Sequence, residues 1–257
     1  MRLLSLAAGT VLDVDPPTAV TVAAAAGFPA VGVWYDDKTW GPQVVRDICA
    51  RLADTGVVPL DIEPVMLSDH GDHGDVIVDA ALAIGARNIL VASRDGDHAR
   101  VAARLHALAA RLDGTDVRLV LEFLPVLAIR TLPDALAIVR AADHPALGVL
   151  VDALHLARAE HVPADLVGVD PHLLPYLQLC DAPTDPPVGI PALLREALHG
   201  RMLPGKGALP LAALLANVPG VPISMELRSE ALRVAFPNPI ARARAVRSSM
   251  GALLADC

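Results

Sequence analysis

Eight short apolar runs recur along the chain at intervals of about 30 residues, and segments with helical periodicity separate them. The expected strands are Leu3–Ala7, Ala30–Trp34, Val57–Ile62, Asn88–Ala92, Val117–Glu122, Leu147–Asp152, Tyr176–Cys180 and Val221–Glu226. The helical segments end at glycine or are followed by proline, and one is expected to open at Thr131, which begins an approximate capping box. Strands that alternate with helices predict an α/β fold with a parallel sheet.

Eight such repeats in 257 residues favour one (β/α)8 TIM barrel as a single domain over residues 1–257. A doubly wound open sheet is the alternative, but the sequence lacks the glycine-rich fingerprint that such a sheet ordinarily carries after an early strand. The long segment 182–207, between the seventh and eighth strands, is expected to contribute to the active face of the barrel.

Composition and charge narrow the classes of function. Hydrophobic residues make up 54% of the chain, yet no apolar run reaches the roughly 18 residues of a membrane span. The net charge of −8 argues against nucleic-acid binding through phosphate neutralisation. Three cysteines (Cys49, Cys180 and Cys257) without paired spacing indicate a reduced, cytoplasmic protein. A small-molecule partner is therefore expected, and a homo-oligomer is left open.

Polar side chains end four consecutive expected strands, and all of them offer oxygen atoms: Glu122, Asp152, Gln178 and Glu226. In a barrel of this kind the carboxyl ends of the strands carry the active site. The two-residue period of a strand supports an inward direction for each of the four. Three converging carboxylates would repel one another without a cation. An oxygen-rich set suits Mg²⁺ or Mn²⁺, with Co²⁺ or Zn²⁺ left open.

Five segments carry a resemblance to a known family: LVLEFLP (119–125), GVLVDALH (148–155), YLQLCDAP (176–183), RMLPGKGALPL (201–211) and ISMEL (223–227). They resemble the xylose isomerase-like barrel superfamily, which includes sugar phosphate isomerases and epimerases and the family 2 AP endonucleases. The resemblance implies one divalent metal held by Glu122, Asp152, Gln178 and Glu226. Glutamine in the third place is similar to hydroxypyruvate isomerase, whereas ketose 3-epimerases have histidine there. Two departures, Phe123-Leu124-Pro125 and Lys206, concern the substrate rather than the metal.

The implied reaction removes a proton beside a carbonyl, with the metal stabilising the enediolate. Glu122 and Glu226 are the candidates for the two carboxylates that remove and return the proton, without an assignment of which does which. His155, in Asp-x-x-His, would contact a substrate hydroxyl or the enediolate, unless it is a solvent-facing histidine. Arg201 is either a substrate anchor or an ordinary loop arginine. Asp181 would contact substrate, orient His155 or Arg201, or simply begin a turn. Glu63 faces the same mouth, in a structural or a substrate-binding role.

Several functions share these features. The first is a metal-dependent isomerase or epimerase of carbohydrate metabolism, acting on a small sugar or hydroxy-keto acid. A dehydratase of the inosose or dehydroshikimate type would use the same enolate chemistry. A non-catalytic metal-binding barrel is the alternative of another class. A DNA-repair endonuclease is disfavoured, because Glu63, Ser93, Gln178 and Asp181 stand where that family needs further histidines.

The segment Asp69–Asp75 alternates acids, histidines and glycines and looks like a metal loop. Its two glycines and its place before a helix favour a flexible, acid-capped loop instead. Because it lies on the catalytic side of the barrel, a lid function is left open.

Overall fold

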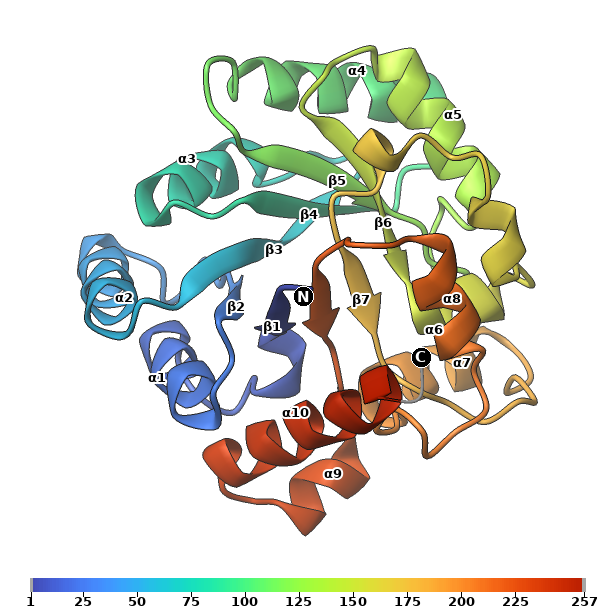
Figure 1. Ribbon diagram of the computed structural model, residues 1–257. Coiled ribbons are helices and arrows are strands. Elements are labelled where there is room, and N and C mark those ends of the chain that lie inside the picture. Colours follow the sequence, from blue (N-terminus) through green and yellow to red (C-terminus); the bar gives the residue numbers. More distant parts are fainter. Residues whose placement is uncertain (1, 256–257) are drawn as a thin grey trace.

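The computed structural model describes residues 2–255, and eight parallel strands close into a barrel in the order β1 to β8 (Figure 1). The strands are β1 Leu4–Leu6, β2 Ala30–Trp34, β3 Val58–Leu67, β4 Asn88–Ser93, β5 Arg118–Glu122, β6 Leu147–Asp152, β7 Leu177–Leu179 and β8 Ile223–Met225. The ring is closed by parallel pairing of β1 with β8. The prediction of a single-domain (β/α)8 TIM barrel is confirmed.

Helices surround the barrel on its outside (Figure 1). They are α1 Pro16–Ala26, α2 Pro42–Thr55, α3 Gly74–Ile84, α4 His98–Ala110, α5 Leu132–Ala142, α6 Ala153–Arg158, α7 Ile190–His199, α8 Leu211–Asn217, α9 Glu230–Ala235 and α10 Pro239–Ala255, with short 3-10 turns at Ala8–Thr10, Pro163–Leu166 and Pro171–Leu173. The predicted cap at Thr131 is confirmed, since its side chain accepts a hydrogen bond from the backbone N–H of Asp134 at 3.3 Å.

The expected strand β3 is the one whose end differs most from the structure. It was expected to stop at Ile62 but continues to Leu67, past Pro64. A proline cannot donate a ladder hydrogen bond, but here it falls where the pairing with β4 shifts register, between Ile62 and Val65. The strand therefore continues with Val65 to Leu67 paired to Val91 to Ser93 of β4. Glu63 lies within β3 and not at its end.

The barrel has two apolar regions, one between strands and helices and one inside the ring. The inner one is a layer of fully or nearly fully buried side chains, one from each of six strands or their flanks: Ala30, Leu60, Leu90, Val120, Leu150 and Tyr176. The next inward-facing positions on β5 and β6 are Glu122 and Asp152, both buried. The apolar layer thus forms the floor on which a polar site rests at the carboxyl ends of the strands.

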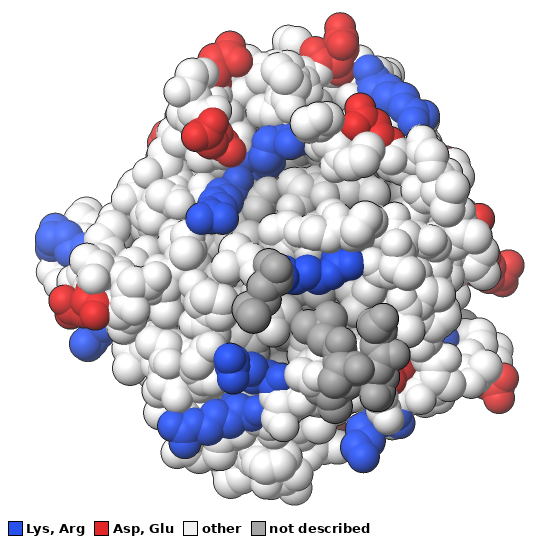
Figure 2. Space-filling view, in the orientation of Figure 1, with Lys and Arg blue, Asp and Glu red and all other residues white. Residues whose placement is uncertain are grey.

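The helices and the surface charges concern two expectations from the sequence, the lack of a membrane span and the lack of nucleic-acid binding. Within residues 2–255, no helix is long and apolar enough to cross a membrane. On the face shown in Figure 2, basic and acidic side chains lie in small groups of both signs, separated by uncharged residues. Cys49 and Cys180 are free thiols, and Cys257 lies outside the described residues.

Candidate metal centre

The four predicted ligands lie at the same end of the barrel and are buried. Glu122 ends β5, Asp152 ends β6, Gln178 is the middle residue of β7, and Glu226 directly follows β8. Their exposed fractions are 6%, 0%, 1% and 6% in that order. Asp152 pairs with Gln178, and Gln178 pairs with Ser224, so parallel register brings the chains at β6, β7 and β8 level with one another. The expected inward direction agrees with this burial.

Asp152 is held on both of its oxygens. One oxygen, Oδ1, caps helix α6 by accepting hydrogen bonds from the N–H groups of Leu154 at 2.7 Å and His155 at 3.1 Å. The other, Oδ2, accepts from Nη1 of Arg201 at 2.6 Å. Burial raises the pKa of Asp152, but the charges of Arg201 and His155 and the hydrogen bonds from Arg201 and the N–H of His155 together outweigh it, so the pKa lies below its usual value. Asp152 is therefore an ionised carboxylate with a fixed orientation.

Arg201 was predicted to anchor substrate, but its guanidinium is already engaged inside the protein. It is 3% exposed and forms ion pairs with Asp152 at 2.6 Å and with Oε2 of Glu226 at 3.2 Å. Its Nε donates to the carbonyl of Ala197 at 2.9 Å, and Nη2 lies 3.4 Å from Nε2 of His155. This geometry makes Arg201 an internal counter-ion that ties two predicted ligands together, and not an exposed loop arginine.

His155 lies closer to the predicted metal ligands than a substrate contact needs to be. Its imidazole joins Glu122 and Asp152 in a buried group whose potential ligand atoms lie within 4.8 Å of one another. Nε2 of His155 is 3.9 Å from Oε1 of Glu122. Burial lowers the pKa of His155 to about 4, so the imidazole is neutral at pH 7. A nitrogen of a neutral imidazole can coordinate a metal ion or accept a hydrogen bond from a substrate hydroxyl, so His155 suits either role.

Gln178 and Glu63 face each other across the barrel and are incompletely satisfied. Nε2 of Gln178 donates to Oε2 of Glu63 at 3.5 Å, which is a weak hydrogen bond. Oε1 of each side chain is buried and has no hydrogen-bond partner among the described residues. Burial, and then the charges of Glu226, Asp61 and Glu122, raise the pKa of Glu63 well above its usual value. Buried oxygens without donors are groups that a cation or an ordered water would satisfy.

The charges of the site fit a divalent cation. Burial and the neighbouring charges of Asp152 and Glu226 raise the pKa of Glu122 well above its usual value. Burial also raises that of Glu226, against the opposing charge of Arg201. Carboxylates whose ionised forms are disfavoured in this way gain stability from an added positive charge. The donor set of carboxylate, amide and imidazole atoms suits Mg²⁺, Mn²⁺ or Zn²⁺.

Glu226 is positioned by Thr10, a residue that sequence reasoning missed. The Thr10 hydroxyl, on the 3-10 turn after β1, donates to the carbonyl of Met225 at 2.8 Å and accepts from the N–H of Leu227 at 2.8 Å. It thus binds the backbone on both sides of Glu226. Gly9 provides the space, because a Cβ there would lie 2.5 Å from Oε1 of Glu226. No pattern in the sequence links these residues across the closing β1–β8 pair.

Asp181 was predicted to contact substrate or to orient His155 or Arg201, and its carboxylate is instead occupied by backbone. Its oxygens accept from the N–H groups of Ala182, Gly205, Gly207 and Leu209 at 2.9–3.0 Å. The side chain is 2% exposed. A Cβ on Gly207 would lie 2.3 Å from the carbonyl oxygen of Ala182, so the loop closes tightly here. This geometry argues for an anchor of the PGKG loop in place of a substrate contact.

The acidic loop 69–75 is tied down by Arg104 of helix α4 and by Arg111, which directly follows that helix. Asp72 accepts two hydrogen bonds from Arg104, at 2.9 and 2.8 Å, and one from the N–H of Gly74 at 2.7 Å. Asp75 accepts from Arg104 and from Arg111. The acids therefore bind cations of the protein itself, which agrees with the interpretation of an acid-capped loop and argues against its flexibility.

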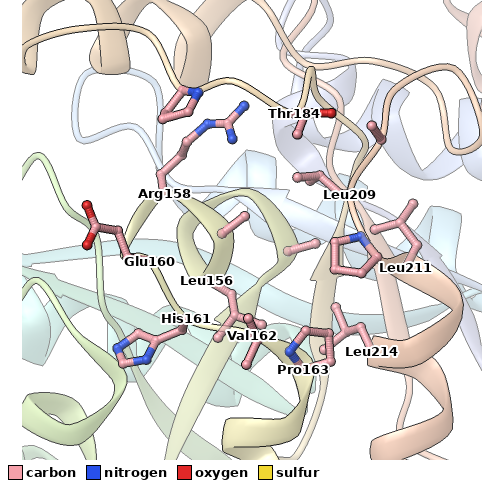
Figure 3. A pocket seen from close by; sticks show the side chains of 15 residues that line it. Leu156, Arg158, Glu160, His161, Val162, Pro163, Thr184, Leu209, Leu211 and Leu214 are labelled. Carbon is pink, nitrogen blue, oxygen red and sulfur yellow. The ribbon is translucent and has the colours of Figure 1, made fainter.

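An apolar pocket of about 270 Å³ lies beside α6, on the side of α8. Figure 3 shows Leu156 of α6 facing Leu209 and Leu211 across it, with the Arg158 side chain at one end. Arg158 is bound to Glu196 through two hydrogen bonds of 2.8 and 2.7 Å. Because α6 begins directly after Asp152, the walls of this pocket support the helix that presents His155.

Comparison with known proteins agrees with this fold. A sequence profile described as xylose isomerase-like TIM barrel matches residues 20–253. Two curated relatives, the 3-dehydroshikimate dehydratases of Pseudomonas putida and Pseudomonas aeruginosa, are each 26% identical over 85% of this chain. The alignments cover 37% of each relative, so the chain spans little more than a third of the length of the curated relatives it matches.

The fold likeness extends to solved structures. The crystal structure of IOLI protein with a bound zinc atom aligns at a TM-score of 0.83 and 15% identity, covering 100% of this chain and 99% of that chain. At such identity the likeness shows the fold alone. The profile, which matches nearly the whole described chain, shows more than this: the chain belongs to the xylose isomerase-like TIM barrel family.

Proposed function

We propose that this protein is a divalent-metal-dependent enzyme that removes a proton from the carbon beside a carbonyl of a small hydroxy-ketone or keto acid. The observation that carries the proposal is the buried set Glu122, Asp152, His155 and Glu226 at the carboxyl ends of β5, β6 and β8. Glu122, Asp152 and Glu226 would hold the metal, with Gln178 or His155 completing the set. A bound divalent ion would stabilise the negative charge that develops on the carbonyl oxygen.

The two glutamates suit opposite roles in proton transfer. Glu226 lies 3.2 Å from the guanidinium of Arg201, which favours its ionised form and makes it the candidate base. Glu122, at the end of β5, is then the candidate for the group that returns the proton. Because Glu122 and Glu226 project from β5 and β8, they reach the substrate from different sides. Neutral His155 would donate a hydrogen bond to, or accept one from, a substrate hydroxyl.

Two outcomes follow from the same first step. Return of the proton to a neighbouring carbon, or to the other face, gives an isomerase or epimerase. Loss of a hydroxyl group gives a dehydratase, and the 26% identity to two 3-dehydroshikimate dehydratases supports this outcome about as well. A dehydratase needs a group that protonates the leaving hydroxyl, and Glu63, which is not among the proposed metal ligands and whose pKa is raised by burial, would supply it.

Proton NMR in deuterium oxide separates these outcomes. Two samples of the purified protein are prepared, one loaded with Mn²⁺ for the reaction and one loaded with Mg²⁺ for recording the NMR spectra. Each is incubated with hydroxypyruvate, D-fructose or 3-dehydroshikimate. We expect deuterium to enter beside the carbonyl of at least one of them. Loss of water from 3-dehydroshikimate would give an aromatic dihydroxybenzoate, visible as new aromatic signals and near-ultraviolet absorption.

The matched variants are Glu122→Gln and Glu160→Gln, of which the second removes an exposed carboxylate outside the site. Glu122→Gln should abolish exchange while retaining the circular dichroism of the folded protein, and Glu160→Gln should keep full exchange. Wild-type activity in Glu122→Gln would contradict the assignment. Metal-dependent thermal stabilisation without exchange on any ketone would favour a non-catalytic metal-binding barrel.

A further inference from the structure

We propose that Arg228 binds an anionic group of the substrate, a carboxylate or a phosphate, at the mouth of the barrel. The inference rests on the proposed function, because it names the class of substrate that the same site would take. It also replaces Arg201 as the predicted anchor, since the guanidinium of Arg201 is buried in contacts with the protein.

Arg228 lies beside the carboxylates but is held by an aromatic ring. It follows Glu226 by two residues and is half-buried. Its guanidinium carbon lies 5.7 Å from the ring centroid of Trp34, the last residue of β2. A cation at this distance from an indole face is attracted by the ring without using its N–H groups. The side chain of Arg228 therefore extends from the end of β8 toward the end of β2, and it passes over the turn that follows β1.

Gly9, in the turn that follows β1, leaves room for the side chain of Arg228 to extend toward Trp34. A Cβ at position 9 would lie 3.2 Å from Cγ of Arg228 as well as 2.5 Å from Oε1 of Glu226. The glycine thus leaves space for both side chains, which approach the same point of the β1 loop. The aliphatic stem of Arg228 runs over this backbone, and its charged end is directed toward Trp34.

The donors of Arg228 are available. Within residues 2–255, its side chain has no hydrogen bond and no carboxylate within the 4.0 Å of an ion pair. Its charge still acts on the site, since it opposes the rise that burial causes in the pKa values of Glu63, Glu122 and Glu226. Arg201, by contrast, uses Nε, Nη1 and Nη2 on protein atoms. Arg228 is thus a cation whose charge reaches the site and whose fork of N–H donors is free, and such a fork matches a carboxylate or phosphate.

The negative charge of the site gives Arg228 a function, because an anionic substrate needs a compensating positive charge. The ionised carboxylates of Asp152 and Glu226 would repel an anionic substrate, and the internal guanidinium of Arg201 is already committed to both of them. A neutral sugar needs no compensation for this field, whereas a keto acid or sugar phosphate does. Arg228 supplies this compensation at the rim, away from the atoms that react.

The test compares three hydroxy-ketones of similar size and different charge: dihydroxyacetone, which is neutral, hydroxypyruvate, which carries a carboxylate, and dihydroxyacetone phosphate. Their affinities are measured by isothermal titration calorimetry on Mg²⁺-loaded wild-type protein and on Arg228→Met, which keeps the stem but removes the charge. Arg228→Lys keeps the charge without the fork. Arg233→Met, five residues along and exposed, is the matched control.

We expect at least one charged probe to bind the wild type about tenfold or more tightly than dihydroxyacetone, and Arg228→Met to lose this preference. Arg228→Lys should keep part of it, and Arg233→Met all of it. Preference for hydroxypyruvate would identify a carboxylate, and preference for the phosphate a phosphoryl group. Dihydroxyacetone should bind Arg228→Met as it binds the wild type.

Equal binding of both charged probes to wild type and Arg228→Met would overturn the proposal. So would a wild type that binds dihydroxyacetone as tightly as the charged probes, or that binds neither charged probe. These affinities are independent of turnover. A protein that prefers anions through Arg228 but exchanges no proton in deuterium oxide would contradict the proposed function and leave this inference standing.

Discussion

Replacing Thr10 with valine removes the hydroxyl that holds the backbone around Glu226, while keeping the shape of the side chain. Thr10 is 5% exposed. In the valine variant the buried N–H of Leu227 loses its acceptor, which costs about 1–3 kcal/mol. The carbonyl of Met225 is less affected, because it also accepts from the N–H of Ala7 at 3.3 Å. The loss is therefore dominated by one unsatisfied donor.

A loss of about 2 kcal/mol lowers the melting temperature by about 4–8 °C in a protein of this size. Differential scanning calorimetry measures this shift, and Thr10→Ser, which keeps the hydroxyl, serves as control and should retain most of the stability. Because Glu226 would lose its fixed position, proton exchange on the accepted ketone should also fall about 10–100-fold. A valine variant that melts at the same temperature as the wild type, or a serine variant that is destabilised as much as the valine variant, would show that the Thr10 hydroxyl does not hold this backbone.

Three further predictions concern the surrounding residues. Arg201→Met should destabilise the metal-free protein by about 3–5 kcal/mol, because it leaves Asp152 unpaired. Added Mn²⁺ should raise the melting temperature of this variant more than that of the wild type. An unchanged melting temperature of the metal-free variant would count against the counter-ion role of Arg201. Gly207→Ala should lower the free energy of unfolding in urea by about 1–3 kcal/mol, since the added Cβ would clash with the Ala182 carbonyl. An unchanged free energy of unfolding would show that the loop moves to make room for the Cβ. The hydrogen bonds from Arg104 lower the pKa of Asp72, so the stability advantage of wild type over Asp72→Asn should be full above about pH 4 and shrink as the pH falls further; an advantage that is constant from pH 7 to pH 3 would contradict this.

The sequence predicted the barrel and the strand ends well because both depend on local patterns. The two-residue alternation that buries Val120 and Leu150 also sends Glu122 and Asp152 inward, and this needs no knowledge of the rest of the chain. Strand β3 was predicted too short, since it runs through Pro64 to Leu67. Only the register shift between β3 and β4, a feature of their pairing, makes Pro64 tolerable.

The partners of the site residues could not be predicted, because they depend on contacts between distant segments. Arg201 meets Asp152 across 49 residues, and Thr10 meets Met225 across 215. Asp181 precedes Ala182-Pro183 and so had the local signature of a turn residue, but its four backbone donors come mostly from the loop at 205–209. Arg228 carried no signal at all, since its importance arises from Trp34 on the other side of the closing strand pair.

We propose that the carboxyl ends of β5 to β8 hold a divalent metal, and anomalous scattering from crystals grown with Mn²⁺ would locate it. We expect one strong peak, coordinated by Glu122, Asp152 and Glu226 together with Gln178 or His155, and a guanidinium of Arg201 that has moved away from Asp152. A structure without such a peak, in which Arg201 still pairs with both Asp152 and Glu226 at saturating Mn²⁺, would contradict it.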